Sequence, residues 1–253
     1  MILTIDIGNT NAMFCIFKGM KILRTLSINI QLIRNEKKLL EHIKKLLSKK
    51  NINGIIISSV VPDLNKVLKK LFNKYFSINP HFISDMIKEL KIKTNIKNKN
   101  EIGTDRIVNV IYAQEIYTPP ILIVDFGTAT TIDYINKKYI YEGGIISPGI
   151  DLSLKSLYKF TAKLPLINFN KTKYIIGNTT NKAIRSGFYW GYIAMIQGLI
   201  ERIKIEKKIK PEIILTGGNA TFFKNKIKNI KIIDKFFIMR GLNFIYRGIY
   251  KNG

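Results

Sequence analysis

The chain has 253 residues, of which 46% are hydrophobic, so it is long enough for one large or two ordinary domains and too apolar for a disordered protein. Its single cysteine, Cys15, excludes an internal disulfide, and its apolar runs are far shorter than the roughly 20 residues of a membrane helix. A formal net charge of +25 would attract polyanions, but no zinc-finger spacing or RNA-binding aromatic motif accompanies it, so we do not expect nucleic acid as a partner.

Strands and helices alternate along the first half of the chain. Runs rich in β-branched residues predict strands, and apolar residues at helical spacing predict helices. The expected strands are 2–7, 12–17, 21–28, 52–62 and 81–84, and the expected helices are 35–50, 63–75 and 104–117. The first two strands are close enough to form a hairpin.

The second half shows a similar succession of elements. The expected strands are 121–126, 131–135, 139–142 and 212–220, and the expected helices are 149–159 and 179–205. Both halves therefore predict a mixed α/β fold that begins with a hairpin.

A short internal repeat links the two halves. "LTIDIGNTNAMFCIF" (3–17) resembles "LIVDFGTATTIDYI" (122–135): each has an apolar strand, an Asp, an apolar residue, a Gly, a polar turn and a second strand. Because the copies lie about half a chain apart, we expect two similar domains, 1–117 and 118–253, joined at "YTPP" (117–120).

The first copy of the repeat allows two interpretations. Asp6, Gly8, Asn9 and Thr10 could form an ordinary hairpin turn, since these residue types favour turns. They could also form a phosphate loop, in which Gly lets backbone N–H groups approach an anion and the carboxylate holds Mg²⁺ through water. Taken alone, this motif leaves both interpretations open.

The second copy favours the phosphate loop. Asp125, Gly127 and Thr128 repeat the same arrangement at the equivalent position of the second half. Two such loops are what a polyphosphate bound from two sides requires. "LTGGNA" (215–220) adds a third glycine turn after a strand, which could be a tight turn or a close approach to a nucleotide.

The motifs together resemble the superfamily of acetate and sugar kinases, actin and heat-shock ATPases, and more closely the type III pantothenate kinases. The motifs that carry this resemblance are "DIGNT" (6–10), "EIGTDRIVN" (101–109), "DFGTATTID" (125–133), "YEGGIISPG" (141–149), "TAKLP" (161–165) and "LTGGNA" (215–220). The resemblance implies two ribonuclease-H-like domains of actin-like ATPase type with a nucleotide cleft between them. It also implies a cytoplasmic homodimer without membrane contact that phosphorylates pantothenate, the first step of coenzyme A synthesis.

The resemblance also implies which residues bind ATP and its cations. The residues expected at ATP are Asp6, Ile7, Gly8, Asn9, Thr10, Asn11, Ala12, Met13 and Thr128. Asp6 is expected to hold magnesium through water, and Asp125 a monovalent cation, potassium or ammonium.

The "GTDR" segment is expected at the acceptor. By resemblance, Asp105 is the catalytic base and Gly103, Thr104, Asp105 and Arg106 bind pantothenate, although the family usually has Ala where Thr104 stands. Without the resemblance, Asp105 would be a first-turn helix carboxylate and Arg106 a structural ion-pair partner. Thr180 corresponds to a further pantothenate contact and would otherwise be a helix cap.

Two departures concern the pantothenate pocket. Many relatives have an aromatic residue where this chain has Ile96, and a Pro where it has Lys99. Three alternatives remain open: another small-molecule kinase, a transcription accessory factor, and an ATPase of the chaperone or filament kind.

Overall fold

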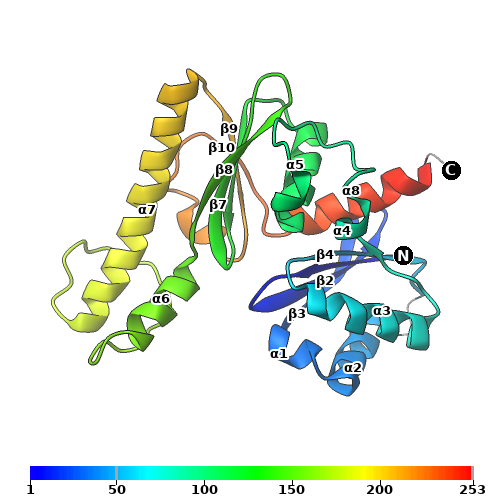
Figure 1. Cartoon of the computed structure of the whole chain (residues 1–253). Helices are drawn as coiled ribbons and strands as arrows, with labels where there is room; N and C mark the ends of the chain where they lie inside the picture. The colour runs from blue at the N-terminus through cyan, green and yellow to red at the C-terminus, as the bar shows by residue number, and fades with distance from the viewer. Residues whose placement is uncertain (49–50, 252–253) are drawn as a thin grey trace. The chain divides into compact units, whose positions relative to one another are not determined.

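The computed structural model describes residues 1–48 and 51–251 and divides by its contacts into two compact units (Figure 1). Unit 1 is Met1–Ile116 with Phe236–Gly253, and unit 2 is Tyr117–Lys235. The sequence repeat instead groups 118–253. The difference is the last helix, α8 (Phe237–Lys251). It packs against α5, β1 and β4, which belong to unit 1.

Unit 1 is built on a five-stranded mixed sheet in the order β3-β2-β1-β4-β5. Its strands are β1 (Ile2–Ile7), β2 (Asn11–Lys18), β3 (Lys21–Asn29), β4 (Gly54–Ser59) and β5 (His81–Phe82). The first three strands are antiparallel, and β4 and β5 run parallel to β1. The predicted hairpin is therefore present, and β4 lies directly beside its first strand.

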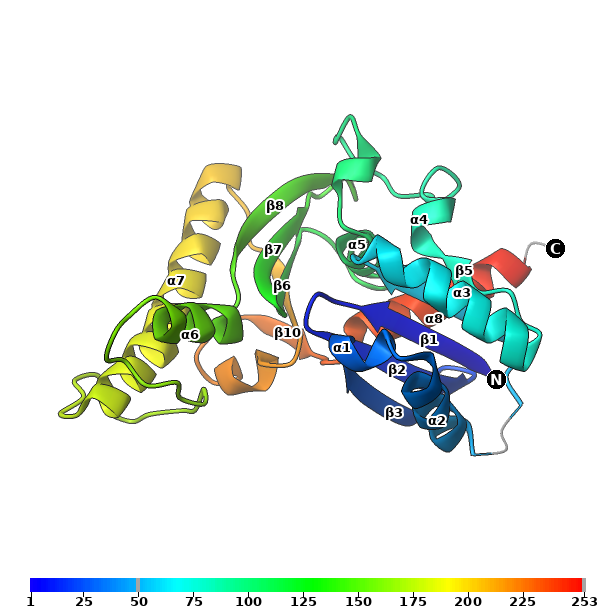
Figure 2. The same ribbon diagram turned by 60° about the horizontal axis from the view of Figure 1, so that its bottom comes forward.

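Helices cover both faces of this sheet. The helices of unit 1 are α1 (Ile30–Ile33), α2 (Glu36–Leu47), α3 (Pro62–Phe76), α4 (Ile83–Met86), the 3-10 turn η1 (Lys99–Glu101), α5 (Thr104–Ile116) and α8. In α2, Leu39, Ile43 and Leu46 recur at helical spacing and are buried against the sheet. Figure 2 shows α2 and α3 in front of the sheet and α8 behind it.

Unit 2 repeats the topology of unit 1. Its sheet has the order β10-β9-β6-β7-β8, in which β6 corresponds to β1 and β9 to β4. Its strands are β6 (Ile121–Phe126), β7 (Ala129–Ile135), β8 (Tyr141–Pro148), β9 (Glu212–Thr216) and β10 (Ile230–Ile233). Again the first three strands are antiparallel and the last two run parallel to the first. The repeat seen in the sequence is thus a repeat of the whole sheet.

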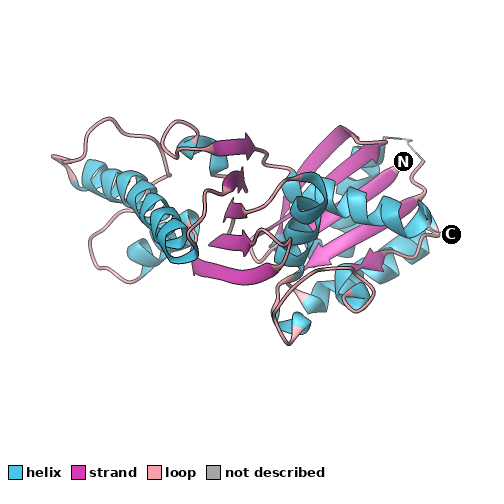
Figure 3. Ribbon diagram, turned by 90° about the horizontal axis from the view of Figure 1, so that it is seen from above, coloured by secondary structure: helices cyan, strands magenta, loops and turns pink. Residues whose placement is uncertain are grey.

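Two helices and a short turn form the rest of the unit 2 core. They are α6 (Ile150–Lys159), the 28-residue α7 (Thr180–Lys207) and the 3-10 turn η2 (Ala220–Phe223). Ile193, Ile196 and Ile200 of α7 pack in one apolar cluster with Leu122 and Val124 of β6. Figure 3 shows α7 along one side of the unit 2 strands. None of the described helices combines the length and hydropathy of a membrane span.

Several elements differ from the sequence predictions. The strand expected at 52–62 is limited to Gly54–Ser59, the one expected at 81–84 ends at Phe82 where α4 begins, and the short helix α1 was not expected. The strand expected at 139–142 is longer and later, because the Asn136 side chain accepts from the Ile140 N–H and forms a turn before β8. No element was expected after residue 220, where the structure has β10 and α8. The helix expected at 35–50 ends at Leu47, and its positions 49–50 lie outside the described residues.

Candidate active site

The first glycine loop joins β1 to β2 in unit 1. Asp6 is the next-to-last residue of β1, where it pairs with Met13 on one side and Ser58 on the other. The loop is closed by a hydrogen bond from the Gly8 N–H to the Asn11 carbonyl oxygen at 3.0 Å. Ile7 and Ala12 have their side chains fully buried in the core. These two residues could therefore contact a nucleotide only through their backbone atoms.

A threonine joins the start of α5 to the end of β4. The Thr104 hydroxyl donates to the Ser59 carbonyl oxygen at 3.0 Å and accepts from the Ser59 N–H at 3.1 Å. It also lies 3.2 Å from the Ser58 hydroxyl. Ser58 pairs with Asp6 in the parallel ladder. The start of α5 is therefore held at the C-terminal ends of β1 and β4, where Asp6 lies.

Asp105 follows at once in the first turn of α5. Its Oδ1 atom accepts from the Arg106 N–H at 2.9 Å and lies against Gly103, where a side chain would collide with it. A carboxylate in the first turn of a helix is stabilised in its charged form by the N–H groups there. Unit 1 thus brings two of the predicted site residues, Asp6 and Asp105, to the same end of its parallel strands β1 and β4. Because the Thr104 hydroxyl is occupied by Ser59, Thr104 could serve a ligand only through its backbone.

The second glycine loop joins β6 to β7 in unit 2. Asp125 is the next-to-last residue of β6, between Thr131 of β7 and Thr216 of β9. A Cβ atom at Gly217 would lie 2.4 Å from Asp125 Oδ1, and Gly217 has a φ of +87°. The turn after β9 therefore needs glycine, and it closes over the Asp125 carboxylate.

Thr128 lies at the tip of this second loop and is held by the start of α6. Its carbonyl oxygen accepts from the Gly149 N–H at 3.0 Å. Gly149 is the N-cap of α6, and a Cβ atom there would lie 2.2 Å from the Thr128 oxygen. Unit 2 therefore brings Asp125, Thr128 and the Gly217 turn together.

Thr180 lies elsewhere in unit 2. It is the exposed first residue of α7, and the N-cap is its neighbour Thr179, whose side chain accepts from the Lys182 N–H at 3.3 Å. The alternative interpretation of Thr180 as a cap is therefore wrong. Tyr192 of the same helix contacts Pro148 beside the Thr128 loop. Twelve residues of helix at about 1.5 Å each place Thr180 roughly 18 Å from Tyr192.

The described residues hold no ready-made metal cage. Among them, no three His, Cys, Asp or Glu side chains are grouped so that they could hold a metal ion by themselves. A divalent ion at Asp6 would need ligands from water and phosphate as well, which is how Mg²⁺ is usually bound in kinases. The carboxylate of Asp125 is approached closely by the Gly217 turn, so that any Cβ atom there would collide with it.

Several residues of the site had no role in the sequence predictions. Ser58 and Ser59 anchor α5, and Gly149 and Tyr192 anchor the Thr128 loop. Ser58 and Ser59 could have been noticed in the sequence, because they form a polar pair at the end of the apolar run 54–59. The contact made by Tyr192 has no sequence signal, because it joins residues 44 positions apart.

The fold is shared with other proteins of known structure. A Campylobacter jejuni protein assigned to the Baf family of transcriptional activators superposes with a TM-score of 0.60 and 24% identity, over 98% of this chain and 99% of that one. A Sinorhizobium meliloti protein assigned as a 2-dehydro-3-deoxygalactonokinase superposes with a TM-score of 0.58 and 10% identity, over 99% and 97%. The predicted two-domain α/β fold of the actin-like kinases is confirmed.

The sequence comparisons are more specific. The family model for "Type III pantothenate kinase" matches residues 2–202. A type III pantothenate kinase of Bacillus cytotoxicus is 40% identical over 254 residues, which cover 97% of this chain and 95% of that protein. Identity of this extent, over the same segments that form the glycine loops and the start of α5, means that this chain belongs to the type III pantothenate kinase family.

Proposed function

We propose that this chain transfers the γ-phosphoryl group of ATP to the primary hydroxyl of pantothenate and so forms 4′-phosphopantothenate, the first step of coenzyme A synthesis. The observation that carries the proposal is the match to the Bacillus cytotoxicus pantothenate kinase along almost the whole chain. Phosphoryl transfer needs little covalent help from the protein; it needs aligned reactants and neutralised phosphate charge. The glycine loops and the acid at the start of α5 are suited to these two tasks.

ATP would bind through the glycine loops of both units. The Asp6–Met13 segment and Thr128 offer backbone N–H groups and hydroxyls to phosphate oxygens. Asp6 would hold the divalent ion, magnesium, through water, and Asp125 a potassium or ammonium ion. Bound there, these cations would offset phosphate charge that the backbone groups cannot neutralise alone.

Asp105 would act as the general base. Its position in the first turn of α5 keeps it charged, so it can accept the proton of the attacking hydroxyl. Arg106, next to it, would pair with the carboxylate of pantothenate through its planar fork of N–H groups. Gly103, Thr104 and Thr180 would complete the contacts to the acceptor.

The test is a comparison of two first-turn aspartates. Asp105→Asn should nearly abolish pantothenate-dependent ATP consumption while ATP still binds. Asp63→Asn is the matched control, because Asp63 is an exposed first-turn carboxylate of α3 outside every motif. It should retain wild-type turnover. Equal turnover in the two variants would contradict the assigned base.

The same assay separates the proposed reaction from two of its rivals. Wild-type enzyme should consume ATP only when pantothenate is present, and faster in potassium than in sodium buffer. Consumption without any acceptor would indicate an ATPase of the chaperone or filament kind. Faster turnover with a sugar or with another pantenoyl compound would indicate a different small-molecule kinase.

A homodimer would cover an apolar surface of unit 2. The segment that joins α6 to α7 exposes large apolar side chains, namely Phe160 (77% exposed), Tyr174 (73%), Ile175 (67%) and Ile176 (86%). This segment is held in place, since Trp190 Nε1 donates to the Tyr174 carbonyl oxygen. We propose a second copy of the chain as the occupant, as the resemblance to type III pantothenate kinases implies. Thr180 follows the patch directly, so the proposed pantothenate contact lies next to the proposed subunit contact.

The oligomeric state tests this surface. The double substitution Phe160→Asp and Ile176→Asp should give a monomer in sedimentation equilibrium. Ile205→Asp is the control, because Ile205 is an equally exposed isoleucine (75%) near the other end of α7. A double variant that still sediments as the wild type does would show that the patch is not the interface.

A further inference from the structure

One peptide group of unit 2 is hydrogen bonded at both of its polar atoms to residues far from it in sequence. It joins Pro148 to Gly149, between the end of β8 and the start of α6. Its N–H donates to the Thr128 carbonyl oxygen at 3.0 Å, and its oxygen accepts from the Tyr192 hydroxyl at 2.9 Å. Because the two atoms belong to one planar group, the partner of the oxygen sets the direction of the N–H.

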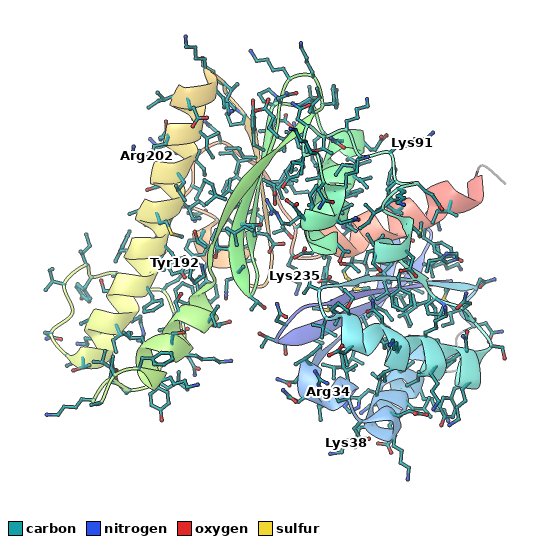
Figure 4. The ribbon with its side chains drawn as sticks, viewed as in Figure 1. Arg34, Lys38, Lys91, Tyr192, Arg202 and Lys235 are labelled. Carbon is teal, nitrogen blue, oxygen red and sulfur yellow. The ribbon has the colours of Figure 1, made fainter. Side chains whose placement is uncertain are left out.

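The Tyr192 hydroxyl is itself held in place. It lies 3.0 Å from the Ser153 hydroxyl. Since the single tyrosine proton is used by the Pro148 carbonyl, Ser153 must donate to the tyrosine oxygen. Burial raises the pKa of Tyr192 above its usual 10.0, so the hydroxyl keeps the proton that it donates. Figure 4 shows Tyr192 midway along α7, level with the start of α6.

The corner at Gly149 cannot move without the second glycine loop. A Cβ atom at Gly149 would lie 2.2 Å from the Thr128 carbonyl oxygen and 2.5 Å from that of Gly127. The backbones of the corner and the loop are therefore in direct contact. Any rotation of the Pro148–Gly149 peptide would both break the bond to Thr128 and push against Gly127.

We infer that Tyr192 is a positioning residue for the ATP loop at Gly127–Thr128. Its hydroxyl fixes the peptide group that holds Thr128, and it thereby sets the direction in which the loop presents its N–H groups and hydroxyl to phosphate. The ring of Tyr192 supplies packing, and the hydroxyl supplies the orientation. This inference rests on the proposed function, in which Thr128 binds ATP.

The test is Tyr192→Phe, which removes the hydroxyl and keeps the ring. Loss of one neutral hydrogen bond should weaken ATP binding by about three- to tenfold, measured as the Kd for ATP by titration calorimetry. The KM for pantothenate should stay within about twofold, since the acceptor segment lies on α5 and Thr180 lies roughly 18 Å along α7 from Tyr192. Ser153→Ala keeps the bond from Tyr192 to Pro148 and should give a smaller change. Tyr189→Phe, on the same helix but in the core, should leave the Kd for ATP unchanged.

Thr128→Ala separates this inference from the proposed function. If Thr128→Ala weakens ATP binding and Tyr192→Phe does not, the role of Tyr192 is refuted and the loop assignment stands. If neither weakens it, the loop assignment fails and the inference fails with it. Equal weakening by Tyr192→Phe and Tyr189→Phe, or a parallel rise in the KM for pantothenate, would show a general structural effect and also refute the inference.

Discussion

The turn after β9 offers a sharp test, because adjacent glycines in it have opposite surroundings. At Gly217, φ is +87°, and a Cβ atom would lie 2.4 Å from Asp125 Oδ1 and 2.6 and 2.7 Å from the backbone C and N of Phe126. At Gly218, nothing lies within 4 Å of the same atom. Gly217→Ala and Gly218→Ala therefore make the same chemical change in a filled and in an open space.

The magnitude follows from two terms. A left-handed conformation costs an L residue about 1–2 kcal/mol, and forcing a methyl group against backbone atoms costs about 1–3 kcal/mol more. The backbone of Phe126 cannot give way easily, since β6 is paired on both sides with β7 and β9. Gly217→Ala should thus lose about 2–5 kcal/mol, whereas Gly218→Ala should stay within about 0.5 kcal/mol of the wild type.

Thermal unfolding without ligands measures the difference. In a chain of this size, 1 kcal/mol shifts the Tm by about 2–4 °C, so the Tm of the two variants should differ by several degrees or more. Because the added methyl group displaces Asp125, Gly217→Ala should also lose the stimulation of activity by potassium over sodium. If Gly217→Ala melts together with Gly218→Ala, the turn does not close over Asp125 and our account of the second loop is refuted.

Two further predictions concern α8 and a surface ion pair. Gly241→Ala should destabilise by about 1–3 kcal/mol, because its Cβ would lie 2.7 Å from Val108 Cγ1 of α5, whereas Gly248→Ala meets nothing and should be neutral or stabilising by up to about 1 kcal/mol. Equal melting of these two variants would contradict the assignment of α8 to unit 1. The hydrogen bond from Asn136 and the ion pair with Lys207 lower the pKa of Glu142 from its usual 4.5. Glu142→Gln should therefore cost less than about 1 kcal/mol at pH 7, and this difference from the wild type should vanish as the pH falls below 4.5 towards the lowered pKa. A difference that persists in acid would show another cause.

Local patterns predicted the two corners well. The first strand of each half was expected at 2–7 and 121–126, and the structure has Ile2–Ile7 and Ile121–Phe126. A strand, a glycine turn and a second strand are neighbours in sequence, so their pairing costs little chain entropy. The turn and strand residues are therefore enough to predict the hairpin. The same locality explains why the helix with a polar start expected at 104–117 matches α5 (Thr104–Ile116).

The last part of the chain was not predictable in this way. No element was expected after residue 220, yet β10 and α8 are there. The helix α8 packs against α5, β1 and β4 of unit 1, all of which lie more than a hundred residues earlier in the chain. A sequence repeat assigns such a helix to the half of the chain in which it lies, because a sequence gives no information on distances in space.

The sequence by itself predicted the family, the strand–glycine–strand corner that begins each half and the helix that starts at the "GTDR" segment, because each depends on short motifs of neighbouring residues. Only the tertiary structure decided that α8 packs on unit 1, that the Thr104 hydroxyl anchors α5 to β4, and that Tyr192 holds the peptide beside Thr128. These contacts join residues more than 40 positions apart. They form when sheets and helices pack, and the hydrogen bonds and close approaches that result are properties of that packing rather than of any short segment.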